Sequence, residues 1–254
     1  MKNINREELN KILKEHELWL EGEGGKRADL SNTDLSNFDL RCADLKNANL
    51  RGVNLSNTDL SNINLSNANL KYANLSNANL KDADLKDSNL SCADLSNANL
   101  RNADLSDAYL RCADLKNVNL NNTDLHRADF KNADLNNADL SNTDLRGVNL
   151  RGTDLSNADL SNANLRCANL SSANLSKANL KDIKTNMHTI GYNLACPEKG
   201  SFIGYKKASG CLIELLILED AKRSSATTAK CRCDKAKVLD IRDIETNNLI
   251  NCVC

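Results

Sequence analysis

A leucine recurs at every fifth residue through most of this chain. From Leu30 to Leu180 every fifth residue is leucine, with Phe130 the one exception, which gives 31 consecutive five-residue units. If the leucine is called position i, then position i−2 is usually alanine, and position i−1 is Asp 16 times and Asn 14 times. An internal repeat of this length constrains the architecture more strongly than any local motif does.

The five-residue period excludes an α-helix and a flat sheet. A helix turns by about 100° per residue, so successive leucines would lie roughly 140° apart and would form no apolar stripe. In a flat strand the side chains alternate with period two, so successive leucines would face opposite sides. The pattern is satisfied if each unit is a short extended side followed by a corner, because positions i−2 and i then face inward together. The sequence therefore predicts a chain that coils around its own leucines.

The units ADLSN, ANLSN and ADLKN resemble those of the pentapeptide-repeat family, whose pattern is A(D/N)LXX. The resemblance covers residues 28–182. It implies an all-β-dominated fold, a right-handed quadrilateral β-helix in which four units make one coil, whereas the period alone would also allow a three-sided coil. With 31 units we expect about 8 coils and, at a strand separation of ~4.8 Å, a rod ~37 Å long.

Residues 1–27 precede the repeat and predict an N-terminal capping α-helix over residues 5–20. Asn5 followed by Glu8 suits a capping box at the helix start, and Gly22 marks its end. One helical face would carry Leu9, Ile12, Leu13 and His16. A stacked coil needs such a cap, because its first layer would otherwise expose leucines and an unpaired strand edge.

Residues 183–254 predict a small β-rich or α+β C-terminal domain. SFIGYKKASGCLIELLILE reads as two strands joined near Ser209 and Gly210, KAKVLDIRDI reads as another, and a short helix is expected near residues 219–222. On the motifs CPEKGSFIGYKK and KRSSATTAKCRCDKA the region resembles an uncharacterised domain that follows pentapeptide repeats in some bacterial and phage proteins. That resemblance implies no activity, although the domain could support a homo-oligomer.

Catalytic signatures are missing from the sequence, so we expect no enzyme and no cofactor. There is no GxxxxGK[ST], GxSxG, GxGxxG or HExxH, and the three histidines, His16, His126 and His188, lie in three different regions. The alternative is an enzyme within residues 183–254, where no catalytic set is recognisable. The basic stretch KRSSATTAKCRCDKAK could bind phosphate, but it lacks interleaved aromatics and suits a solvated face better.

The cysteines of the C-terminal region raise the question of a metal site. Two CxC pairs supply the zinc-ligand candidates Cys231, Cys233, Cys252 and Cys254. Paired CxxC knuckles are absent, so reduced structural or exposed thiols are the favoured interpretation.

The charged N-terminus has no apolar signal core and no run approaches 18 apolar residues, which leads us to expect a cytoplasmic protein with no membrane segment.

Residues 20 apart stack in a four-sided coil, so the charge of each side can be summed from the sequence. The side centred on Leu50, Leu70, Leu90, Leu110 and Phe130, called the positive side below, sums to +3. The adjacent side centred on Leu55 to Leu155, called the negative side, sums to −3, and the remaining two sides sum to −2 each. Exposed aromatic and arginine residues, which protein interfaces favour, gather at the positive side and its two corners. We predict partner binding by Tyr72, Tyr109, Arg111, His126, Arg127 and Lys131.

The sequence thus favours a non-enzymatic protein-interaction scaffold, with a protein partner of unknown identity. The family resemblance also implies an alternative, a DNA mimic that binds a type II topoisomerase such as gyrase. Mimicry needs dense negative charge, and residues 28–182 carry 16 basic against 20 acidic groups. Nucleic acid is not expected as a partner either, because no region is strongly basic.

The negative side also holds a column of asparagines from Asn37 to Asn157, which predicts a hydrogen-bonded ladder, with lattice-like or ice-like binding as an alternative.

Overall fold

The computed structural model describes residues 1–36, 38–186 and 188–191 together with their side chains, and the backbone of five strands between residues 202 and 243. Two compact units are present, Met1–Gly191 and Tyr192–Cys254. Each unit is considered by itself below. Within the described residues, no helix combines the length and the apolar character needed to cross a membrane.

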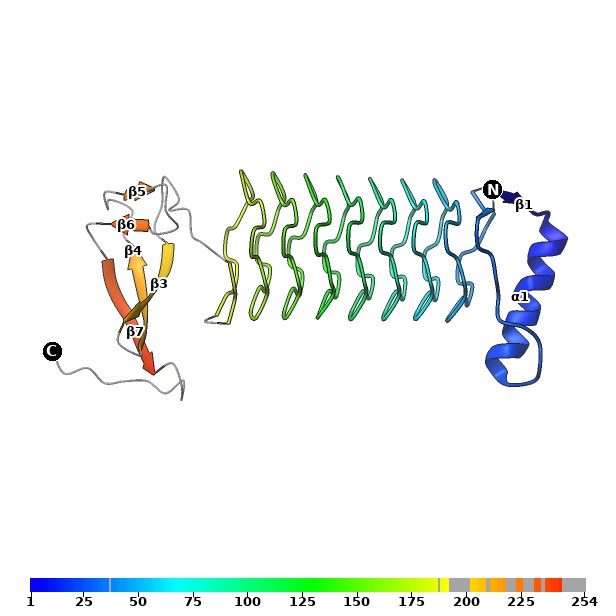
Figure 1. Ribbon diagram of the computed structural model, residues 1–254, viewed down its shortest axis with the longest axis horizontal. Coiled ribbons are helices and arrows are strands. Elements are labelled where there is room, and N and C mark those ends of the chain that lie inside the picture. Colours follow the sequence, from blue (N-terminus) through cyan, green and yellow to red (C-terminus); the bar gives the residue numbers. More distant parts are fainter. Residues whose placement is uncertain are drawn as a thin grey trace. The chain divides into compact units, whose positions relative to one another are not determined.

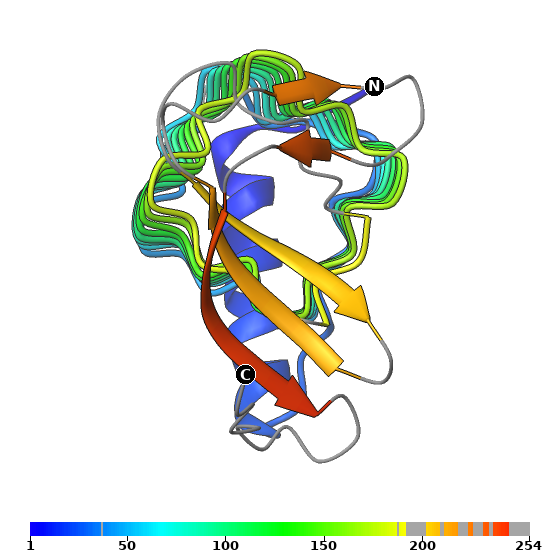
Figure 2. The same ribbon diagram turned by 90° about the vertical axis from the view of Figure 1, so that its left-hand side faces the viewer.

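Within Met1–Gly191 the chain winds into stacked coils (Figures 1 and 2). Parallel bridges join i−1 residues that are 20 positions apart, from Asp29 with Asn49 to Asn164 with Lys184. Four five-residue units therefore complete one coil, as the resemblance implied, since a three-sided coil would bridge residues 15 apart. The stacking places one leucine layer directly on the next.

The unit formed by residues 94–98 illustrates how every backbone amide finds an acceptor. The amide of Asp94 donates to the preceding coil (2.9 Å), and those of Leu95 and Asn97 donate to the following coil (2.7 and 2.8 Å). The Ala98 amide donates to the Leu95 carbonyl and closes the corner (3.0 Å). The remaining amide, that of Ser96, donates to the carboxylate of Asp94 (2.9 Å). Asp or Asn at i−1 thus satisfies the one amide that the coils cannot, which buried backbone requires.

The interior is a column of leucines with small residues beside them. Leu30 to Leu170 are 0–2% exposed, and Phe130 is also fully buried. Most residues at i−2 are buried alanines, with Val, Thr and Ile63 at other levels. Leu175 and Leu180 are only half-buried, so the dry core ends near Leu170.

Position i+2 adopts a left-handed backbone at almost every corner, with φ between 52° and 69° from Asn32 to Asp182. Glycine and Asn/Asp tolerate this region best, which explains why they dominate at i+2. The Asp and Asn residues at i−1 are also of types that tolerate an unusual φ, so the residue types alone would allow a left-handed backbone there. The structure assigns that role to i+2, while i−1 belongs to the bridged, extended side.

The asparagine column on the negative side owes its regularity to this corner geometry more than to a ladder. Asn37 lies outside the described residues, and from Asn57 to Asn157 one bond joins neighbouring coils, from Asn117 Nδ2 to Asn97 Oδ1 (3.0 Å). Amide contacts between coils are more frequent at i−1. Such pairs include Asn49 to Asp29, Asn54 to Asp34, Asn99 to Asn79 and Asn149 to Asp129 (all 2.9 Å).

The N-terminal segment covers the first coil. Helix α1 (Arg6–Glu21) begins after Asn5, whose side chain accepts a hydrogen bond from the amide of Glu8 (2.8 Å), and it ends at Gly22, which is left-handed with φ 77°. Strand β1 (Lys2–Asn3) pairs in parallel with β2 (Thr33–Asp34). The short strand thereby occupies part of the edge that the first coil would otherwise leave open.

His16 is the buried polar residue of this helix. Its side chain is 0% exposed, its Nδ1 accepts a hydrogen bond from the amide of Ala28 (3.1 Å), and its ring stacks on Trp19 with centroids 5.6 Å apart. Burial lowers the pKa of His16 below its usual value. The backbone of Lys46 and the carboxylate of Asp44 act in the opposite direction.

The second unit, Tyr192–Cys254, is built from strands in the described backbone. Strands β3 (Phe202–Ala208), β4 (Cys211–Ile217) and β7 (Ala236–Asp243) form an antiparallel sheet in the order β3-β4-β7. Strands β5 (Arg223–Ser225) and β6 (Cys231–Cys233) form a separate antiparallel pair. The strand patterns of the sequence coincide with β3, β4 and β7, and the helix expected near residues 219–222 lies outside the described residues.

Replacing Asn77 tests the corner geometry. Asn77 is exposed with φ 58°, so Asn77→Ala should lower the free energy of unfolding by about 1 kcal/mol, because a Cβ without a polar group disfavours this conformation. Asn77→Gly should stay close to the unsubstituted protein. Urea denaturation measures both values. A glycine variant less stable than the alanine variant would contradict the explanation.

His16 should make stability depend on pH. The unfolded residue takes up a proton near its usual pKa of 6.5, and the folded residue does so only at lower pH. The unfolded state therefore binds more protons in this window, so the contribution is fully present above pH 6.5 and is lost as the pH falls below it. Urea midpoints at about pH 7.5 and about pH 5.5 measure the difference. His16→Gln should reduce that difference, and an unchanged pH dependence would argue against the assignment.

Candidate docking surface

The positive side carries a column of cations at i+1. Its members lie on coils that are stacked by backbone hydrogen bonds, for example from the Gly52 amide to the Lys71 carbonyl (2.9 Å) and from the Asn132 amide to the Arg151 carbonyl (3.0 Å). The column consists of Arg51, Lys71, Arg111, Lys131 and Arg151. In the described residues, Lys131 and Arg151 have no carboxylate within ion-pair distance. Their charges are therefore available to a partner.

Tyr72 stands at one corner of this side and is 49% exposed. Its backbone is left-handed with φ 64°, a conformation that a tyrosine adopts at a cost of about 1–2 kcal/mol. The guanidinium of Arg51 lies 4.8 Å from the ring centroid and the ammonium of Lys71 lies 4.9 Å from it. These cation–π contacts hold the ring among the positive charges.

Tyr109 occupies an i−1 position, where every other unit has Asp or Asn. Its backbone bridges Asn89 and Asp129 like any other unit, and its side chain is 51% exposed. A tyrosine has no oxygen close enough to accept from the amide two residues on, so the usual side-chain contact is given up here. Arg111, on the same side, forms an ion pair with Asp129 (2.5 Å). An exposed aromatic ring therefore occupies the position where the other units have a carboxylate or amide side chain.

The other two predicted residues belong to the opposite corner. Arg127 is left-handed with φ 58° and pairs with Asp107 (3.4 Å). The His126 amide donates to Asp124 Oδ1 (2.9 Å), and the Nδ1 atom of His126 is buried without a hydrogen-bond partner. The structure therefore groups Tyr109, Arg111 and Lys131 on one side and places Tyr72, His126 and Arg127 at or beyond its edges. Partner binding by these six residues stays a prediction.

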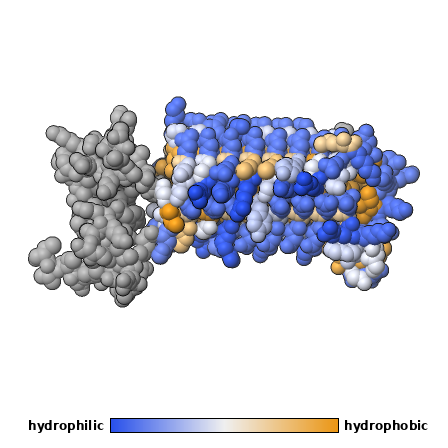
Figure 3. All heavy atoms as spheres, viewed as in Figure 1, coloured by the Kyte–Doolittle hydropathy of each residue, from blue (hydrophilic) through white to orange (hydrophobic). Residues whose placement is uncertain are grey.

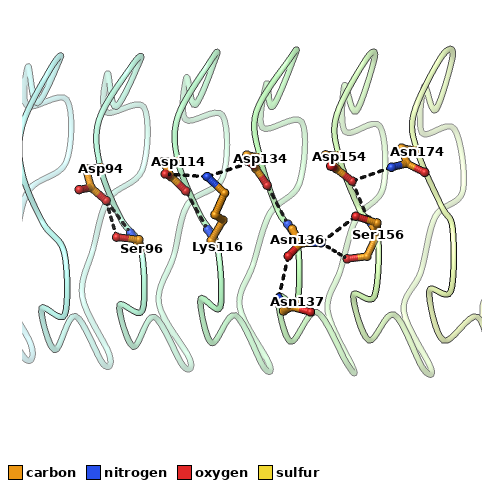
Figure 4. A network of polar contacts seen from close by, with 10 residues as sticks. All are labelled: Asp94, Ser96, Asp114, Lys116, Asp134, Asn136, Asn137, Asp154, Ser156 and Asn174. Atoms are coloured by element: carbon orange, nitrogen blue, oxygen red, sulfur yellow. Dashed lines mark hydrogen bonds and ion pairs between the residues drawn. The ribbon is translucent and has the colours of Figure 1, made fainter.

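The carboxylates of the negative side are occupied by contacts within the coils (Figure 4). Lys116 Nζ lies 3.1 Å from the carboxylates of both Asp114 and Asp134. Asp154 Oδ1 accepts from Asn174 Nδ2 (3.0 Å) and from the Ser156 amide (2.9 Å). Hydrogen bonding with the side chain and then the amide of Ser156 lowers the pKa of Asp154. These side chains support the backbone and form no acid–base pair.

A shallow hollow lies where helix α1 meets the first coils, and the sequence did not reveal it. Its lining comes from Arg6, Asp39, Arg41, Cys42, Ser61 and Asn62. Hydrogen bonds from Arg41 lower the pKa of Asp39 to about 2. The repeat pattern could not place Arg6 beside Asp39, because Arg6 belongs to the helix and its contact with the Asp39 carbonyl (3.4 Å) depends on how the helix packs.

The side chains of the four predicted zinc ligands lie outside the described part of the structure. Cys231 and Cys233 lie in β6, of which the backbone alone is described, and Cys252 and Cys254 lie outside the described residues. In the part of the chain that is described, no three or more His, Cys, Asp or Glu side chains gather in a way that could hold a metal ion.

The surface drawn in Figure 3 is mainly hydrophilic over the coils, as expected for a rod whose apolar residues point inward.

Comparison with family models identifies the repeat: the model for pentapeptide repeats (8 copies) matches in overlapping segments from residue 28 to residue 182. The chain belongs to the pentapeptide-repeat family. Members of this family form a right-handed β-helix. Residues 192–252 match a second model, a family of unknown function (DUF5758).

Several solved structures are similar to this pentapeptide-repeat protein. HetL, a pentapeptide-repeat protein involved in heterocyst differentiation regulation from the cyanobacterium Nostoc sp. strain PCC 7120, is 30% identical over 74% of this chain and 98% of its own, with a TM-score of 0.22. Rfr23 from the cyanobacterium Cyanothece 51142 is 40% identical over 36% of this chain, with a TM-score of 0.36, and the match spans 63% of the length of Rfr23.

Full-length QnrB1, a plasmid-mediated fluoroquinolone resistance protein, is 21% identical over 63% of this chain and 92% of its own, with a TM-score of 0.37. No curated protein matches the chain.

Proposed function

We propose that this pentapeptide-repeat protein is a non-enzymatic interaction scaffold that docks an acidic protein segment on its positive side. The observation that carries the proposal is the pair of half-exposed tyrosines, Tyr72 and Tyr109, at positions where the coil itself favours Asn or Asp. Neither ring contributes to the leucine core. Aromatic residues next to arginines are typical of the energetically dominant part of protein interfaces.

Charge supports the choice of an acidic partner. The charge of Arg111 is balanced by its ion pair with Asp129, and Arg51 and Lys71 make cation–π contacts with Tyr72. The three cationic side chains nevertheless stay at the surface of the coil. Lys131 and Arg151 add charge that has no ion pair among the described residues. The cations lie on coils ~4.8 Å apart, with Ser91 interrupting the column between Lys71 and Arg111. Such an arrangement suits carboxylates on an extended segment, and this complementarity mainly accelerates association and selects the partner.

Two variants of the positive side test the proposal. Tyr72→Asn with Tyr109→Asn restores the residues usual at those positions, so the rod should stay folded. Lys131→Glu with Arg151→Glu reverses the uncompensated charges. In capture from nuclease-treated lysate followed by titration of the retained protein, each variant should weaken binding by about 30-fold or more, the effect of losing one interface hot spot of about 2 kcal/mol.

Lys81→Glu with Arg101→Glu is the matched control. These two cations also occupy i+1 positions, but on the side centred on Leu80 and Leu100. Binding should survive in this control and should weaken as salt is raised. A partner retained equally by all three variants, or no specific partner at all, would refute docking on the positive side.

A DNA-mimicking role toward gyrase is not favoured by the charges of the coil. Basic residues at i+1 and i+2 lie among the acidic residues of the coil, and Lys116 is ion-paired with both Asp114 and Asp134 on the most negative side. We therefore expect no inhibition of gyrase-catalysed supercoiling of plasmid DNA at roughly micromolar protein, a concentration at which a tight mimic would compete. Inhibition that is retained when Lys131 and Arg151 are replaced by Glu would favour the mimic over the scaffold.

A further inference from the structure

Two exposed cysteines occupy adjacent coils at the corner beside Tyr72. Cys92 and Cys112 both lie at i+2, and their φ angles are 58° and 57°. The Cys92 amide donates to the carbonyl of Arg111, the residue before Cys112 (2.9 Å), so the two cysteines are in register across the coil boundary. Coils ~4.8 Å apart place the two Cα atoms within the range of about 4.4–6.8 Å that disulfides span.

Two asparagine side chains in this corner column reach toward the following coil. A Cβ added to Gly52 would lie 2.5 Å from Asn32 Oδ1, and a Cβ added to Gly152 would lie 2.5 Å from Asn132 Oδ1. Gly52 and Gly152 are members of the same column as the two cysteines. The terminal atoms of one residue therefore reach the Cβ position of the residue 20 further on.

The same reach occurs at two other corners. Asn102 Nδ2 donates to Asp82 Oδ1 (3.0 Å), and Asn117 Nδ2 donates to Asn97 Oδ1 (3.0 Å). All four residues are at i+2 and have φ between 56° and 59°. This backbone therefore allows side chains at stacked i+2 positions to contact each other directly. In the described coils, one such stacked pair consists of two thiols, Cys92 and Cys112.

We propose that Cys92 and Cys112 form a redox couple that closes to a disulfide across two coils, with glutathione disulfide as the oxidant. One thiolate attacks a sulfur of glutathione disulfide, which forms a mixed disulfide and releases one glutathione thiolate. The neighbouring thiolate then attacks the protein sulfur of that mixed disulfide, and the second glutathione leaves as a thiolate. Overall two protein thiols are oxidised to one disulfide, one glutathione disulfide is reduced to two glutathione molecules, and the two thiol protons end on the two released glutathione thiolates.

The chain contains internal controls for this reaction. Cys42 and Cys167 are also exposed, at i+2, with φ 57° and 61°. Cys42 stacks on Asn62 of the following coil. Cys167 lies after Gly147 of the preceding coil, and its Sγ atom accepts from Asn186 Nδ2 (3.4 Å), so neither cysteine has one of the described thiols beside it. A mixed disulfide formed at either position cannot be resolved by an adjacent cysteine of the repeat.

This inference is independent of the proposed docking function, although the pair lies at a corner of the same side. The experiment below needs no partner, so a failure of docking on the positive side would leave its outcome unchanged. Conversely, absence of the disulfide would leave the docking test unaffected.

Peptide mapping of the oxidised full-length protein tests the couple. The protein is treated with increasing glutathione disulfide until Cys42 is modified, the remaining thiols are alkylated, and trypsin is added. Cleavage after Lys86, Arg101, Arg111 and Lys116 places the two cysteines in separate peptides, residues 87–101 and 112–116. We expect these peptides to be joined by a disulfide, whereas Cys42 and Cys167 carry glutathione. Mixed disulfides at Cys92 or Cys112 should disappear roughly 10-fold or more faster than that at Cys42.

Single replacements separate the couple from general thiol reactivity. In Cys92→Ser, Cys112 should retain glutathione as Cys42 does, and in Cys112→Ser the same should hold for Cys92. Stable glutathione on both Cys92 and Cys112 of the unsubstituted protein would overturn the proposal. So would the absence of the linked peptides under conditions that modify Cys42.

Discussion

The rest of the structure depends on the hydrogen bonds between coils that are 20 residues apart. Within one unit, three of the five amides donate to a neighbouring coil, one closes the corner, and one is taken by the side chain at i−1. No unit could satisfy its backbone alone, and no leucine could be buried without the layers next to it. Stability is therefore shared between neighbouring coils, as in other repeat proteins. A chain with 3% aromatic residues builds a dry core in this way from leucine and alanine.

The backbone geometry of the coil distinguishes residues that support the coil from residues that do not. The left-handed corner at i+2 favours Asn, Asp and Gly, so a tyrosine, an arginine or a cysteine at that position brings no benefit to the backbone. Such residues persist only where the surrounding structure tolerates their strain, and strained positions are often functional ones. Tyr72, Cys92 and Cys112 are three consecutive departures in one column. That clustering, more than the charge of the side, distinguishes this corner from the others.

The acidic residues of the coil have the opposite character. Asp at i−1 accepts from the amide two residues on, and several of these carboxylates also accept from an asparagine on the next coil. Hydrogen bonds from the serine two residues on are the main cause that lowers the pKa of Asp29, Asp34 and Asp59, which keeps these groups ionised. A carboxylate held in this way neither donates nor accepts a proton readily near neutral pH. The repeated aspartates are therefore supports of the scaffold, and the docking that we propose relies on the outward cations and aromatic rings.

The sequence by itself determined the coil, its inward leucines and, to within one residue at each end, the N-terminal helix. It could do so because these features depend on local periodicity and on residues such as Asn5 and Gly22, whose backbone preferences act within one turn. It also located the candidate docking residues, since stacking follows from a period of 20 once four sides are assumed. Only the tertiary structure decided that i+2, and not i−1, takes the left-handed backbone, and that Arg111 pairs with Asp129. The contacts of Arg51 and Lys71 with Tyr72, and the reach of one corner side chain to the next coil, were likewise decided by the fold. Their physical reason is the separation and rotation between coils, which depend on how whole layers pack and are not encoded in any single unit.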